Sequence, residues 1–92
     1  MRYRSRTDII TMILDSARPG ISKTRIMYTA YLSYFQLGQY LKYLIENELL
    51  ELEAGTQLYR PTEKGLKFLN MSYDLNEMLA LPNPKINRNF FS

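Results

Sequence analysis

The first third of the chain alternates short stretches of helically spaced apolar residues with clear breaks. The first stretch follows Ser5, which stands three residues before Asp8 in the spacing of an N-terminal capping box. Pro19-Gly20 ends this stretch, because proline cannot continue a helix. Ser22 is the expected N-cap of a second, shorter helix that runs to about Ala30. The pattern therefore predicts two helices before residue 31, joined by a tight break.

A third helix is predicted after Ser33, which forms a second capping box with Gln36. Its expected core stripe is Leu37, Leu41, Leu44 and Ile45. Its expected outward positions are Gln36, Gln39, Lys42, Tyr43 and Glu46. The helical period stops at Asn47, so the predicted helix spans about thirteen residues.

After Asn47 the apolar period changes from helical to alternating. Leu50–Glu53 and Leu58–Tyr59 each alternate apolar and polar residues, and a break at Ala54–Thr56 separates them. Two such segments around a glycine-containing turn predict a β-hairpin. Pro61 ends the second strand because it has no backbone N–H for the ladder.

A fourth helix is expected from Thr62, its N-cap, to about Ala80, with Pro82 and Pro84 beyond it. Its apolar residues are spaced three, four and three apart, as in a short coiled coil. The residues expected in a dimer interface are Phe68, Leu69, Met71, Ser72, Leu75, Met78 and Leu79. The alternative is that this stripe folds back on the core of its own subunit, but the first three helices already supply a core for so short a chain.

The order helix, helix, turn, helix, hairpin, helix predicts an α+β fold that is mainly α: a winged helix-turn-helix with a C-terminal dimerisation helix. We expect a DNA-binding domain over residues 1–61, a dimerisation helix over 62–81 and an extended tail over 82–92. No apolar run is long enough to cross a membrane, and no signal-peptide pattern precedes the first helix. We therefore expect a cytoplasmic protein with no membrane partner.

Composition narrows the function classes more than the net charge of +3 does. The chain has no Cys and no His, which removes thiolate chemistry, the usual general base and the commonest metal ligand. No remaining group of residues supplies a nucleophile beside a base, so we expect no enzyme, no cofactor, no metal and no small-molecule substrate. The charge is polarised, with six basic against two acidic residues in 1–25, and one against four in 26–59.

Candidate DNA contacts fall on the second and third helices. Gln39 and Gln36 can read adenine and Lys42 can reach guanine acceptors, whereas the alternative is an ordinary solvated helix face. Tyr34 is placed to donate to a phosphate, while tyrosines of this helix can also pack along its edge. The full set of expected DNA-binding residues is Ser22, Lys23, Thr24, Arg25, Ser33, Tyr34, Gln36, Gln39, Lys42, Tyr43 and Arg60.

Three sets of residues near the expected interface have open alternatives. Residues 22–25 open the second helix, where free N–H groups suit a phosphate, but Arg25 is as well suited to a surface ion pair. Arg4 and Arg6 form either a basic arm or a frayed terminus. The hairpin offers only Arg60 among glutamates, so we expect a wing that contributes little, or a partner other than DNA.

Several ordered segments resemble the small archaeal winged-helix DNA-binding proteins that dimerise through a C-terminal antiparallel coiled coil. These segments are Lys23–Met27, Leu32–Tyr34, Leu41-x-x-Leu44, Leu49-Leu50 and Thr62-Glu63-Lys64-Gly65 with Phe68-Leu69, and the likeness covers roughly Ser5 to Leu79. Where such proteins commonly carry glycine after the third helix this chain has Glu48, so we expect Asn47 to take the left-handed conformation.

The resemblance implies a homodimeric transcription regulator or nucleoid-associated protein that binds double-stranded DNA. The alternative is a protein-interaction module on the same fold, which the acidic stretch 46–53 and the tyrosine-rich surface favour. Salt-dependent binding to a duplex distinguishes the two.

Overall fold

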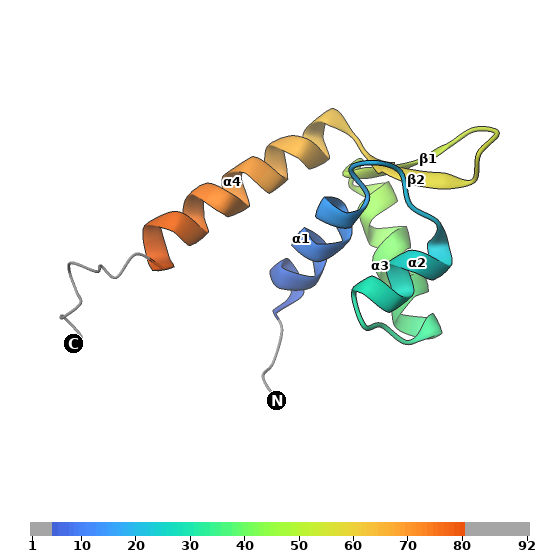
Figure 1. The fold of residues 1–92 in the computed structure, drawn as a ribbon, viewed down its shortest axis with the longest axis horizontal. Coiled ribbons are helices and arrows are strands. Elements are labelled where there is room, and N and C mark those ends of the chain that lie inside the picture. Colours follow the sequence, from blue (N-terminus) through green and yellow to red (C-terminus); the bar gives the residue numbers. More distant parts are fainter. Residues whose placement is uncertain (1–4, 81–92) are drawn as a thin grey trace.

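The computed structural model describes residues 5–80, in which four helices and one two-stranded antiparallel sheet follow the predicted order (Figure 1). The elements are α1 Arg6–Ser16, α2 Lys23–Thr29, α3 Tyr34–Glu46, β1 Leu50–Glu53, β2 Leu58–Pro61 and α4 Glu63–Ala80. This mainly helical α+β arrangement confirms the predicted winged helix-turn-helix fold. Arg4, of the expected basic arm, and the expected tail at 82–92 lie outside the described residues.

Local side-chain hydrogen bonds start the helices, as the sequence predicts. The Ser5 hydroxyl accepts a hydrogen bond from the backbone N–H of Asp8, whose carboxylate accepts one from the N–H of Ser5, both at 3.0 Å. Ser33 and Gln36 form the same reciprocal pair at the start of α3. Ser22 caps α2 through its hydroxyl. The N-caps predicted at Ser5, Ser22 and Ser33 are therefore confirmed.

One hydrophobic core lies between α1, α2, α3, the hairpin and the first half of α4. Its largest fully buried side chains are Ile13, Leu14, Ile26, Leu37, Leu44, Leu50 and Leu69. The prediction that Ile45 belongs to this core is wrong, since 42% of its surface is exposed. Ile45 follows Leu44, and one residue turns a helix by about 100°, which carries its side chain out of the buried stripe.

The end of α3 is a Schellman motif in which a glutamate takes the position that glycine usually occupies. The N–H of Leu49 donates to the carbonyl of Leu44 at 2.8 Å, and the N–H of Glu48 donates to the carbonyl of Ile45 at 3.0 Å. Glu48 has φ +59°, whereas Asn47 is right-handed with φ −92°. The expectation that Asn47 takes the left-handed position is thus wrong. Its side chain instead donates to the Tyr43 carbonyl at 2.9 Å.

The hairpin is joined to the chain before α2 by a short third pairing. Within the hairpin, Leu50 pairs with Pro61 and Glu53 with Leu58, in regular antiparallel register. On its other side, β2 exchanges two backbone hydrogen bonds with Ile21, through Tyr59, at 2.8 and 3.0 Å. The hairpin is therefore fixed to the helical domain at its base.

The start of α4 is fastened to the loop that follows α3. The hydroxyl of Thr62 accepts from the N–H of Gly65 at 3.0 Å and donates to the carbonyl of Glu48. The ammonium of Lys64 donates to the carbonyl of Asn47 at 2.9 Å. The sequence Thr62-Glu63-Lys64-Gly65 is therefore the junction between the end of α3 and the start of α4.

From this junction α4 runs back across α1 and then extends beyond the rest of the domain (Figure 1). Where the two helices meet, Thr11 and Ser72 share a hydrogen bond between their hydroxyls. The Tyr73 phenol donates to Asp15 at 2.7 Å, and together with the hydrogen bond from Arg18 it lowers the pKa of that carboxylate. The part of α4 up to Tyr73 therefore packs against the domain.

Candidate nucleic-acid interface

The side of α3 opposite the core is exposed to solvent. Its buried positions Leu37, Leu41 and Leu44 face inward, and the residues on the opposite side form the surface that we call the α3 face. The α3 face consists of Phe35, Gln39, Lys42, Tyr43 and Glu46, all of them exposed. The structure thus brings together three of the predicted DNA-binding residues, Gln39, Lys42 and Tyr43, on one surface.

Two cations are held against aromatic rings at opposite ends of α3. The guanidinium carbon of Arg6 lies 5.0 Å from the centre of the Tyr43 ring, near the end of the helix. The ammonium of Lys23 lies 5.5 Å from the centre of the Tyr34 ring, at its start. A cation at such a distance is attracted by the negative face of the ring. The positive charges therefore flank the α3 face instead of lying only along it.

An open groove of about 720 Å³ lies along this surface, between α3 and the start of α1. Arg6 and Lys42 line it together with Gln39, and Glu46 adds the only acidic side chain among its lining residues. The groove thus offers cations and an amide to a ligand, with one carboxylate near its end.

Three predicted contact residues are instead occupied in helix capping. The hydroxyls of Ser22 and Ser33 accept hydrogen bonds from the backbone N–H groups of their own helices. The Gln36 amide oxygen accepts from the N–H of Ser33 at 2.9 Å. Bidentate reading of adenine needs both the oxygen and the nitrogen of the amide, so Gln36 cannot do it while the capping box is formed.

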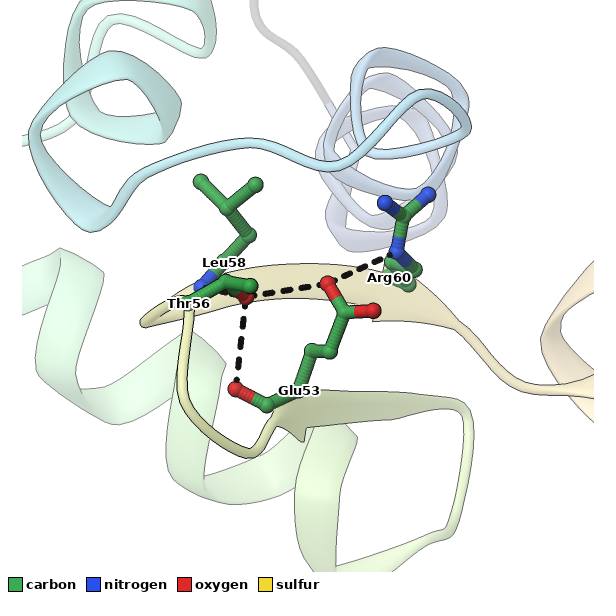
Figure 2. A network of polar contacts seen from close by, with 4 residues as sticks. All are labelled: Glu53, Thr56, Leu58 and Arg60. Atoms are coloured by element: carbon green, nitrogen blue, oxygen red, sulfur yellow. Dashed lines mark hydrogen bonds and ion pairs between the residues drawn. The ribbon is translucent and has the colours of Figure 1, made fainter.

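Arg60, the predicted contact of the hairpin, is held in an ion pair (Figure 2). Its Nε donates to the Glu53 carboxylate at 3.1 Å, and Glu53 also accepts from the Thr56 hydroxyl at 2.9 Å. The hydrogen bond from Thr56 and then that from Arg60 hold the pKa of Glu53 below its usual value, so the carboxylate stays charged and keeps the pair. Arg60 is therefore paired with Glu53 within the hairpin. It is the only basic residue of the hairpin at residues 50–61, so every basic residue there is in an ion pair.

Three residues predicted for the dimer interface belong to the subunit's own core. Leu69 is fully buried, and Ser72 is buried against Thr11. Phe68 is partly buried against the core. The reason is that this part of α4 packs across α1. The two segments are about sixty residues apart in the sequence, so helical periodicity does not reveal the contact. Of the residues predicted for the dimer interface, those that remain exposed are Met71, Leu75, Met78 and Leu79.

The sequence interpretation missed three features of this surface. Phe35 lies in the middle of the α3 face with 72% of its surface exposed, and Gly38 lies beside it without a side chain. Arg6 was considered only as part of a terminal arm, yet it reaches the α3 face through Tyr43. Phe35 stands four residues before Gln39 and seven before Lys42, a spacing that places it on the same side of the helix.

Within residues 5–80, no group of three or more acidic side chains lies close enough together to hold a metal ion. Among the same residues, no helix combines the length and the apolar character needed to span a membrane.

Comparisons with known proteins agree with this architecture. The family model described as Winged helix-turn-helix matches residues 3–80. The chain is 34% identical over 80 residues to the uncharacterized protein MJ0287 of Methanocaldococcus jannaschii, covering 85% of this chain and 80% of that protein. Its fold is similar to the crystal structure of Sso10a-2, a DNA-binding protein from Sulfolobus solfataricus, with a TM-score of 0.71 and 25% identity over 82% of this chain and 81% of that one. The chain belongs to the winged helix-turn-helix family.

Proposed function

We propose that the chain binds double-stranded DNA by placing α3 in the major groove. The observation that carries this proposal is the α3 face, where the side chains of Gln39 and Lys42 form no hydrogen bond to another side chain within residues 5–80 and line an open groove. Arg6 and Lys23 flank this face. The third helix of a helix-turn-helix domain is the element that enters the groove. The similarity to a DNA-binding protein of the same fold supports this choice of ligand.

The proposed contacts are of two kinds: those that read the base sequence and those that position α3 on the DNA backbone. Gln39 can pair with adenine and Lys42 with guanine acceptors or a phosphate, so these two residues contact base edges. Arg6, Lys23 and Arg25 are exposed cations around α3 and contact phosphates, which set the position of the helix without reading sequence. Tyr34 and Tyr43, under two of these cations, lie where their hydroxyl groups can donate to the same phosphates.

We further propose that the protein acts as a homodimer. Met71, Leu75, Met78 and Leu79 are exposed on the outer half of α4. Contiguous exposed apolar surface on a small domain marks an interface, and a two-fold dimer presents two α3 helices to one duplex. The proposed dimerisation segment is therefore residues 71–79, which is shorter than the whole of 62–81. A dimer of this kind suits a transcription regulator or a nucleoid-associated protein in the cytoplasm.

A protein-interaction module is the second candidate, because the surface carries unusual features for a DNA-binding domain. Tyr28, Tyr31 and Phe35 are each about 70% exposed or more, and the hairpin carries Glu51 beside the paired Glu53. Such a module would have no affinity for a duplex and would tolerate changes at Lys42.

Two substitutions, one that removes a positive charge and one that removes a negative charge, test which surface contacts DNA. Lys42→Gln removes a cation from the α3 face and is expected to weaken binding to a duplex roughly fivefold. Glu46→Gln removes an anion from the same face and is expected to strengthen binding roughly threefold, because it ends a repulsion with phosphates. Fluorescence anisotropy with a labelled duplex at low salt measures both.

Lys67→Gln is the matched control, since it removes an equal charge from an exposed position of α4. If Lys42→Gln and Lys67→Gln weaken binding equally, only net charge matters and the proposed interface is wrong. If neither variant nor the unaltered protein binds the duplex, the protein-interaction module becomes the better account.

A further inference from the structure

Gly38 stands in the middle of the recognition helix, where the fold gives no reason for a glycine. Its backbone is ordinary right-handed helix, because it is not among the residues with positive φ. A Cβ built on Gly38 would meet no heavy atom within 4 Å. Glycine is the least favourable residue inside a helix apart from proline. The absence of a side chain therefore weakens α3 and serves no contact within the chain.

An apolar hollow lies over Gly38. It measures about 330 Å³ and is lined by Tyr34, Phe35, Gln39 and Lys42. Phe35 and Tyr34 are 72% and 73% exposed, so their rings project on one side of the missing side chain. The Gly38 position thus combines open backbone with exposed apolar walls on a surface that otherwise offers polar groups.

We propose that this hollow receives the C5-methyl group of a thymine in the major groove, an inference that rests on the proposed binding of DNA by α3. Thymine is the base that presents a methyl group there, and phenylalanine is one of the side chains that contact it. Lys42 lines the hollow and Lys23 lies over the Tyr34 ring, while no acidic residue lines it. The positive charge around the hollow therefore suits the phosphates of DNA, and its apolar lining suits a base edge that carries a methyl group.

Gly38 contributes by leaving room. Glycine permits close approach of a helix backbone to a ligand, because no Cβ stands between them. Phe35 then packs against the methyl group, and Gln39, one residue after Gly38, reaches the adjacent base edge. The protein is thus expected to prefer sites with a thymine opposite Gly38.

The ligand half of this proposal is tested by removing the methyl group from the DNA. An A·T-rich duplex is compared with the same duplex in which deoxyuridine replaces thymidine, by anisotropy with the unaltered protein. Burial of one methyl group corresponds to about fourfold in affinity, so the thymine duplex is expected to bind at least about fourfold more tightly.

The protein half is tested with Gly38→Ala and Gly38→Leu. Both replace glycine with a better helix former, so each variant is expected to melt at a higher temperature than the unaltered protein. Both are nevertheless expected to bind the thymine duplex more weakly, and Gly38→Leu is expected to lose the preference for thymine over deoxyuridine. Asn70→Ala, on the exposed side of α4, is the control that strengthens a helix without touching the hollow.

Opposite changes in stability and affinity cannot come from a folding defect. Equal affinity for the two duplexes, or a Gly38→Leu variant that keeps the full thymine preference, would overturn the inference and leave DNA binding intact. If the unaltered protein binds neither duplex, the proposed function itself fails.

Discussion

Gly65→Ala is expected to destabilise the protein by about 3 kcal/mol or more, because the added methyl group meets backbone atoms. A Cβ on Gly65 would lie 2.1 Å from the carbonyl oxygen of Leu49 and 3.1 Å from its carbonyl carbon. Both contacts are to backbone, which cannot rotate aside as a side chain can. The clash therefore has to separate α4 from the loop after α3.

That separation would break several hydrogen bonds at once. The N–H of Thr62 donates to the carbonyl of Leu49 at 3.0 Å, and Thr62 and Lys64 both donate to neighbouring carbonyls of the same loop. Because these bonds hold α4 to the end of α3, α3 is also expected to lose its orientation.

Urea denaturation followed by far-UV circular dichroism measures the change in the free energy of unfolding. Lys67→Ala, two residues further along the same helix and exposed, serves as the control and is expected to stay within about 0.5 kcal/mol of the unaltered protein. A Gly65→Ala variant as stable as this control would mean that α4 does not pack against Leu49 as described.

Leu75→Asp is expected to turn the proposed dimer into a monomer and to weaken the proposed DNA binding by about a hundredfold. In the single subunit 55% of the Leu75 surface is exposed, so a carboxylate there costs the isolated fold little. In the proposed dimer the same carboxylate is removed from water without a partner, and burial of an unpaired charge is strongly unfavourable. The two α3 helices then bind independently, and the gain from bivalent binding is lost.

Light scattering after size exclusion gives the mass, and anisotropy gives the affinity for a duplex long enough for two half-sites. Asn70→Asp adds the same charge on the other side of α4 and controls for repulsion between the added carboxylate and DNA. A Leu75→Asp protein that remains dimeric would show that residues 71–79 do not form the interface.

The helix starts were predictable because their causes are local in the sequence. Each capping serine and its partner stand three residues apart, and the hydrogen bonds in the structure join those same residues. The hairpin was predictable for a similar reason, since alternation and a glycine-containing turn lie within twelve residues.

The errors occur where distant segments decide the outcome. Leu69 and Ser72 continue the apolar stripe of α4, and only the crossing with α1 shows that they are already buried. The sequence does not show that Arg60 is in an ion pair. The fold of the hairpin turn places Glu53 beside Arg60, and Thr56 donates a hydrogen bond to the same carboxylate.

The left-handed residue after α3 shows a third kind of limit. Asn47 has the better intrinsic preference for that conformation. The Schellman hydrogen bonds to Leu44 and Ile45 nevertheless place Glu48 there, because Leu49 must enter the core immediately afterwards. Intrinsic preference was therefore overridden by the burial of the following residue.

The central claim, that α3 and its flanking cations bind duplex DNA, is tested most directly by the affinity of the unaltered protein for a duplex across a salt series. Arg6, Lys23, Arg25 and Lys42 in each subunit of a dimer predict that log K falls linearly with log salt concentration, with a slope of roughly −4 to −7. Binding that is insensitive to salt, or no binding even in low salt, would contradict the account.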